Sequence, residues 1–233
     1  MNAPRWHGVR ATALFIVMSL GYGCVQLAKS FPEKHYYAIE LSPQNERTAP
    51  TIGSVLKIRK LRVAPQFEGK ELVYRTNEVQ FESDFYNEWF IQPNAMLTQQ
   101  LQNWLVYEGP FQYVVDASSA LEATHILEGV VTGLYGDYRD QGRPKAIVEV
   151  QMVLIKDRPS GEEILFRREY SEKVHVPEQS PDALTKGWTE GFRQLFTALA
   201  KDIQKVDLTS TGHKETSTPR IMPSKAKRKS NGD

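Results

Sequence analysis

The side chain whose type and position most clearly suggest covalent chemistry is the only cysteine, Cys24. It directly follows Gly23, and before it lie a basic leader with Arg5 and Arg10 and a short apolar run over residues 11–20. A membrane-spanning helix needs about 20 apolar residues, so this run suits the hydrophobic region of an export signal better. Bacterial lipoprotein signals place a small residue before a cysteine whose thiol is then acylated. We therefore predict that Cys24 is lipidated, for example with palmitate.

Two positions before the cysteine depart from the lipoprotein pattern. Leu20 lies four residues before Cys24 instead of three, and Tyr22 is bulkier than the alanine or serine usually found there. Gly21 and Gly23 also form a small-x-small site, so ordinary signal cleavage is one alternative and an uncleaved anchor is another. The cysteine count favours lipidation, because a single cysteine in an exported protein has no disulfide partner and acylation accounts for it.

The rest of the sequence contains no pattern of a known enzyme class. It has no zinc-protease histidine pair, no Gly-x-Ser-x-Gly turn, no phosphate-binding glycine loop and no paired cysteines. His35, His125 and His175 are isolated in predicted strands, where we expect surface or packed residues and not ligands. We therefore expect no enzyme, no metal site and no cofactor.

One cluster of aromatic residues stands out just before the first predicted helix. Its five members are Phe81, Phe85, Tyr86, Trp89 and Phe90, and the acidic residues Glu82, Asp84 and Glu88 lie among them. Such density is compatible with an exposed patch for a partner or an acyl chain. Core packing between strand and helix is the alternative, and we favour it for the cluster as a whole.

Hydrophobic periodicity predicts an α+β domain, with a mostly antiparallel sheet and two amphipathic helices packed on one face. The first helix is expected after Pro93, with Asn94 as its cap, and ends at Gly109. Alternating residues between Ala146 and Ile155 indicate a strand with one solvated face. The other predicted strands cover residues 35–41, 55–64, 72–75, 79–89, 111–115, 125–138 and 164–176.

The second predicted helix has the strongest periodic signal in the sequence. Ser180 and Pro181 supply a capping residue and a first-turn proline, and an apolar stripe continues to Val206. Gly187 and Gly191 on this helix permit close approach to the sheet or to a neighbouring subunit, and we favour the contact within the chain.

The C-terminal residues 207–233 are basic and polar without apolar periodicity, which predicts a disordered tail. Contact with anionic phospholipid or lipopolysaccharide is one function for such a tail, although a solvated terminus is the commoner case. The net charge of +1, and a tail without aromatic residues, give no support for nucleic-acid binding.

The order of these parts resembles a known family, the ABC-type transport auxiliary lipoproteins (PqiC-like, MCE-associated). The resemblance covers about residues 14–206 and includes the tryptophan-bearing last helix. No single motif is diagnostic, and the matching parts are Gly23-Cys24, Tyr36-Tyr37-x-Ile39-x-Leu41, Phe85-Tyr86-Asn87-Glu88-Trp89, Pro93, Met96–Leu101, Leu127–Val131 and Ala146–Ile155.

The resemblance implies a signal peptide (1–23), a lipidated tether (24–34) and an auxiliary lipoprotein domain (35–206), and the basic tail (207–233) is an addition outside it. It implies a lipid-anchored periplasmic accessory of an MCE/ABC-type intermembrane lipid transport system. The partners would be an MCE-domain protein and an ABC transporter permease/ATPase complex, and a homo-oligomer is an open expectation. Cys24 is the only site residue that it carries over. Val25 and Gln26 give no inner-membrane retention signal, so we expect the outer membrane ahead of the inner one. The alternative is a stand-alone periplasmic protein that binds a lipid or another apolar ligand between helices and sheet.

Overall fold

The computed structural model describes residues 33–43, 50–140 and 142–208. The predicted signal peptide, Cys24 and the tail beyond residue 208 lie outside these ranges. None of the helices in the described ranges is long and apolar enough to cross a membrane.

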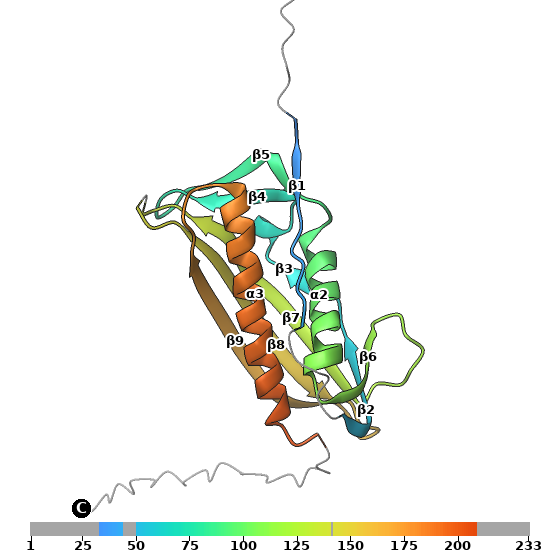
Figure 1. Cartoon of the computed structure of the whole chain (residues 1–233). Coiled ribbons are helices and arrows are strands. Elements are labelled where there is room, and N and C mark those ends of the chain that lie inside the picture. The colour runs from blue at the N-terminus through green and yellow to red at the C-terminus, as the bar shows by residue number, and fades with distance from the viewer. Residues whose placement is uncertain (1–32, 44–49, 141, 209–233) are drawn as a thin grey trace, which may run out of the picture.

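The described chain forms one mixed sheet with two long helices lying across the same face (Figure 1). Helix α2 (Pro93–Glu108) and helix α3 (Pro181–Gln204) contact each other as well as the sheet. The remaining elements are β1 (His35–Tyr37), β2 (Thr51–Ile58), β3 (Arg62–Val63), the short 3-10 helix η2 (Pro65–Phe67), β4 (Glu71–Arg75), β5 (Phe81–Trp89), β6 (Phe111–Asp116), β7 (His125–Asp137), β8 (Lys145–Lys156) and β9 (Glu163–His175).

Strand β7 organises the sheet because both of its edges are paired along most of its length. On one edge it runs antiparallel to β8, which in turn runs antiparallel to β9. On the other edge it pairs in succession with β2, β3 and β4, and all three of these strands run parallel to it. The sheet continues through β6 next to β2, and through β5 and β1 next to β4.

The α+β class and the two helices are confirmed, but the expectation of a mostly antiparallel sheet needs correction. The two longest pairings are antiparallel, whereas β1 with β5, β2 with β6, and β7 with its three short neighbours are parallel. The reason is that β2, β3 and β4 follow one another along a single edge of β7 and do not fold back as hairpins. Alternation within a strand marks its solvated face and carries no information on the direction of its neighbour.

The two helices begin differently. As predicted, Ser180 caps α3, and its hydroxyl accepts a 3.2 Å hydrogen bond from the amide of Ala183. The predicted cap of α2 is wrong, because the N-cap is Gln92 with Pro93 at the first helical position, which places Asn94 inside the helix.

Close packing of α3 on β8 and β9 depends on small residues. A Cβ atom added at Gly187 would lie 2.6 Å from Val176 Cγ1 and 2.7 Å from Ala146 Cβ. Trp188 lies between Gly187 and Gly191 in the sequence and is fully buried. Its indole nitrogen donates a 3.2 Å hydrogen bond to the carbonyl of Tyr135. The close approach predicted for the glycines therefore occurs within the chain.

Candidate functional surface

Strand β5 contains an irregularity that pushes aromatic side chains out of the sheet. Glu71 of β4 pairs with Glu88 of β5, but the next residue, Leu72, pairs with Asp84. Three residues of β5, 85–87, therefore have no partner on β4 and form a bulge longer than the usual single extra residue. Phe85 and Tyr86 belong to this bulge.

The carboxylate of Asp84 holds the bulge in place. It accepts hydrogen bonds from the Tyr74 hydroxyl (2.7 Å), the Asn87 side-chain amide (2.8 Å) and the backbone amides of Tyr86 (2.9 Å) and Asn87 (3.1 Å). Burial acts to raise the pKa of Asp84, but these hydrogen bonds outweigh it and leave the pKa below its ordinary value. The bulge is thus stabilised by specific hydrogen bonds to the ionised carboxylate of Asp84.

Four aromatic rings near this bulge are exposed, and we call them the aromatic patch: Tyr36 (54%), Phe85 (66%), Tyr86 (42%) and Phe90 (65%). The preference for core packing of the aromatic cluster was therefore wrong for three of these residues and also for Phe81, which is exposed nearer the other end of β5. It holds only for Trp89, which is 2% exposed.

Strand geometry explains which rings face the solvent. Trp89 points towards the helices, where its ring lies 5.2 Å from that of Trp188. Successive side chains alternate between the faces of a strand, so Phe90 points the opposite way. Tyr36, on the neighbouring strand β1, lies against Phe90 with ring centroids 6.3 Å apart. The amide of Phe90 donates a 2.7 Å hydrogen bond to the Tyr37 carbonyl, which extends the β1–β5 pairing to the patch.

Two lysines lie among the rings of the patch. The Lys34 ammonium group lies 4.5 Å from the centre of the Phe85 ring and forms an ion pair with Glu88. The Lys70 ammonium group lies 5.7 Å from the centre of the Tyr36 ring. The patch therefore combines exposed apolar ring surface with two cations at ring distance.

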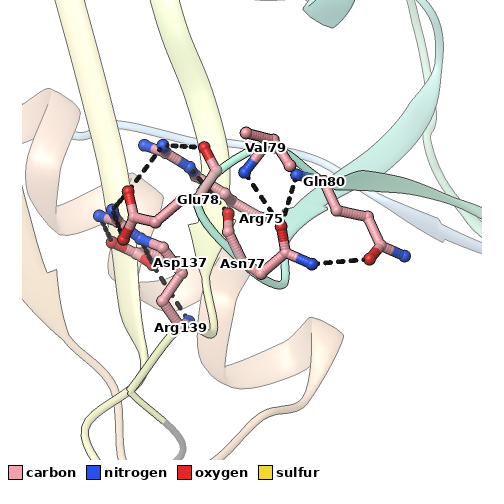
Figure 2. Close-up of polar contacts among 7 residues, drawn as sticks. All are labelled: Arg75, Asn77, Glu78, Val79, Gln80, Asp137 and Arg139. Atoms are coloured by element: carbon pink, nitrogen blue, oxygen red, sulfur yellow. Dashed lines mark hydrogen bonds and ion pairs between the residues drawn. The ribbon is translucent and has the colours of Figure 1, made fainter.

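A cluster of polar contacts connects the β4–β5 hairpin with the end of β7 (Figure 2). Arg139 pairs with Asp137 at 2.8 Å and with Glu78 at 2.9 Å, while Arg75 donates a 2.6 Å hydrogen bond to the Glu78 carbonyl. Asn77 Oδ1 accepts bonds from the two amides that follow Glu78 in the turn. The hydrogen bond from Arg139 lowers the pKa of Asp137 despite some burial. These contacts tie the hairpin to the end of β7, which is a structural role.

The three histidines of the described chain lie far apart in strand positions, as the sequence predicted. His35 and His175 are exposed, whereas His125 is buried beside Phe111, with 5.4 Å between their ring centroids. Burial, with a smaller contribution from Lys156, lowers the pKa of His125 to about 4. Within residues 33–43, 50–140 and 142–208 no three acidic, histidine or cysteine side chains are grouped to hold a metal ion.

Comparison with protein families gives a match over most of the described chain. The family model described as the ABC-type transport auxiliary lipoprotein component matches residues 37–203. No curated protein matches the chain.

Solved structures share the fold at low sequence identity. Protein XCC0632 from Xanthomonas campestris, of the DUF330 family, is 15% identical with a TM-score of 0.65, and the match covers 73% of this chain and 95% of that one. A crystal structure of an uncharacterized protein is 22% identical with a TM-score of 0.58, over 73% of this chain and 99% of that one. At these identities the likeness concerns the fold alone.

Proposed function

This chain belongs to the family of ABC-type transport auxiliary lipoprotein components, and on that premise we propose that it is a lipid-anchored periplasmic accessory subunit of an MCE/ABC-type intermembrane lipid transport system. The family match over residues 37–203 is the observation that carries the proposal. It confirms the resemblance seen in the order of sequence parts. Membership implies association with an ABC-type transport system and a membrane-anchored periplasmic location, and the family is not an enzyme family.

The interior of the domain supports a structural or docking role over a ligand-binding one. The space between the helices and the sheet is filled by buried aliphatic and aromatic side chains, and Trp104 and Phe192 are both in ring contact with Phe196. At Gly187 the sheet leaves no room even for an added Cβ atom. An apolar ligand at this place would have to displace the packed core, which counts against the alternative of a stand-alone lipid-binding protein.

The anchor of the proposed subunit is Cys24, acylated after removal of residues 1–23, with the outer membrane as its location. Several acyl chains attach a protein firmly, whereas one chain binds only reversibly. Intact mass of the protein from its native membrane should show acyl chains on a mature N-terminus at Cys24. Cys24→Ala should shift the protein in fractionation, either to the soluble periplasm or to the inner membrane with an uncut signal. If the wild-type protein carries no acyl chain and fractionates like the variant, lipidation at Cys24 is ruled out and ordinary signal cleavage after Gly23 takes its place.

Partnership with the transport system is tested by affinity purification. The chain with a C-terminal tag, expressed with its whole operon and extracted in detergent, should recover an MCE-domain protein and ABC transporter subunits. A tagged, unrelated lipoprotein from the same membrane is the matched control. Recovery of the chain alone, with its acyl chains intact, would contradict the assignment to an MCE-type system.

A further inference from the structure

We propose that the aromatic patch is a bilayer-contact surface that rests on the phospholipid leaflet in which the chain is anchored. The proposal rests on the proposed function, because it uses lipidation at Cys24 to fix which surface meets the membrane. It goes beyond that function by assigning a second, non-covalent membrane contact to the folded domain.

The chemistry of the patch suits a membrane interface. Tyr36 contacts Phe90, and Phe85 contacts Tyr86 at 5.2 Å. Lys34 links these two pairs of rings, because it lies over the Phe85 ring and pairs with Glu88, which is the register partner of Tyr36 on β5. Aromatic rings prefer the membrane–water interface, where the ring lies at headgroup depth and a hydroxyl stays hydrated. Lysine side chains at such a surface keep the ammonium group near lipid phosphates. Three carboxylates lie next to the rings. Lys34 forms an ion pair with Glu88, Glu71 lies opposite Glu88 on β4, and the charge of Asp84 is engaged in the hydrogen bonds of the bulge.

The patch lies close to the predicted anchor along the chain. Lys34 follows Cys24 by ten residues, so even a fully extended chain of that length reaches only about 35 Å. Strand β1, which carries Tyr36, is therefore held close to any membrane in which Cys24 is embedded. Docking of a surface that is already tethered so closely costs little additional loss of freedom. This tether is why we favour a lipid surface over a second copy or a protein partner.

The fold determines how the domain would be oriented with the patch on the bilayer. Helix α3 ends at the opposite end of the molecule from β1 and β5 (Figure 1). With the patch on the bilayer, the α3 end projects into the periplasm, where a transport partner would meet it. Asp84 holds the bulge with four hydrogen bonds, so Phe85 and Tyr86 are presented in a fixed arrangement before contact.

The main experiment uses the acylated full-length protein, reconstituted in vesicles of phosphatidylethanolamine and phosphatidylglycerol. Amide hydrogen exchange is compared between vesicles and detergent-free protein released by cleavage in the tether. Peptides that cover β1 and residues 84–91 should exchange about tenfold more slowly on vesicles, while β9 and α3 should not change. An acylated protein whose patch exchanges equally in both forms would overturn the proposal while leaving the proposed function intact.

A second experiment separates the patch from the anchor. The mature chain from residue 24 with Cys24→Ser, which carries no acyl chain, is sedimented with the same vesicles. The triple variant Phe85→Ser, Tyr86→Ser, Phe90→Ser should bind about tenfold more weakly than this parent. The matched control replaces three exposed apolar residues elsewhere, Tyr107, Tyr113 and Ile164, and should bind like the parent.

A second copy of the chain or a protein partner at the aromatic patch would give different results with the same variants. If the triple variant dissociates an oligomer, or loses an MCE-domain partner, while its vesicle binding equals that of the parent, the surface is a protein interface and the proposal fails. Circular dichroism and thermal melts verify that the variant folds. Should it not fold, the exchange experiment on the unmodified protein still decides the question.

Discussion

The Tyr74 hydroxyl donates a hydrogen bond to Asp84 Oδ2 over 2.7 Å, and this bond joins β4 to the point at which β5 leaves its ladder. Tyr74 lies on β4, the strand with which the bulge residues of β5 do not pair. Its hydrogen bond therefore holds the Asp84 carboxylate from outside the bulge. Burial and the bond to Asp84 raise the pKa of Tyr74, which therefore remains a donor at every physiological pH.

Replacing this donor should weaken the bulge and the domain together. Tyr74→Phe leaves the ring but removes the hydroxyl, and a hydrogen bond to a charged acceptor contributes about 1.5–3 kcal/mol. We expect a loss of that size in the free energy of unfolding from urea titration, and faster hydrogen exchange at the amides of Tyr86 and Asn87. Tyr107→Phe, at an exposed position, is the control and should change neither quantity. Unchanged exchange in Tyr74→Phe would mean that the bulge does not depend on this bond.

The two helix glycines should differ in their tolerance of alanine. At Gly187 an added Cβ would meet Ala146 Cβ at 2.7 Å, and neither side chain can move away without a backbone shift. At Gly191 the nearest atom is Val148 Cγ2 at 3.1 Å, which a small adjustment can relieve. Alanine also improves helix propensity by about 1 kcal/mol.

Gly187→Ala should therefore lower the free energy of unfolding by up to about 2 kcal/mol, since overpacking costs about 1–3 kcal/mol and the gain in helix propensity offsets about 1 kcal/mol of it. Gly191→Ala should change it by less than about 1 kcal/mol. Thermal melts of both variants against the wild type make the comparison. Equal melting temperatures for the two would show that α3 can move off β8 at little cost.

The sequence predicted those elements whose signal is local. The apolar stripe and the Ser180-Pro181 start located α3, and alternation located β8, because these patterns need no knowledge of the partner strand. The parallel pairing of β2, β3 and β4 with β7 was not predictable in this way, since it depends on contacts between segments distant in the chain.

The aromatic patch was missed for the same physical reason. Whether Phe85 and Tyr86 face the core depends on the register of β4 against β5, which shifts by three residues at the bulge. One local signal was available: an aspartate whose carboxylate can accept the amides two and three residues on is typical of a turn and not of a regular strand. Cys24 lies outside the described residues, so its lipidation stays a prediction.

The boundary between the domain and the tail can be tested by truncation. Leu208, assigned to the tail from the sequence, is 9% exposed and packs on the core, and its carbonyl accepts a 3.1 Å hydrogen bond from Lys156. A chain that ends at Val206 should lose about 1–2 kcal/mol of stability, because burying a leucine contributes about 1.5–3 kcal/mol. A chain that ends at Leu208 should melt like the full length, since residues 209–233 are largely polar. Equal melting of both truncations would place the boundary at residue 206, as predicted from the sequence.

The buried His125 predicts a pH dependence of stability near neutrality. Its pKa is lowered to about 4 in the folded protein from an ordinary value of 6.5. Between these values the unfolded chain binds a proton that the folded chain does not, so stability decreases as the pH falls through 6.5 towards 4. By this linkage the folded state should lose about 2 kcal/mol between pH 7.5 and pH 5. The carboxylates with lowered pKa, such as Asp84 and Asp137, lose their contribution only below their ordinary value of 3.8, outside this window.

Urea midpoints measured at half-unit steps of pH should reveal the His125 contribution as a slope. His125→Gln keeps a polar side chain of similar size but cannot titrate, so its midpoint should be nearly flat over the same window even if the variant is less stable throughout. The matched control His35→Gln, at an exposed position of β1, should keep the slope of the wild type. A wild type whose midpoint does not fall between pH 7.5 and pH 5 would mean that the folded protein accommodates the proton on His125, and that its environment next to Phe111 admits water.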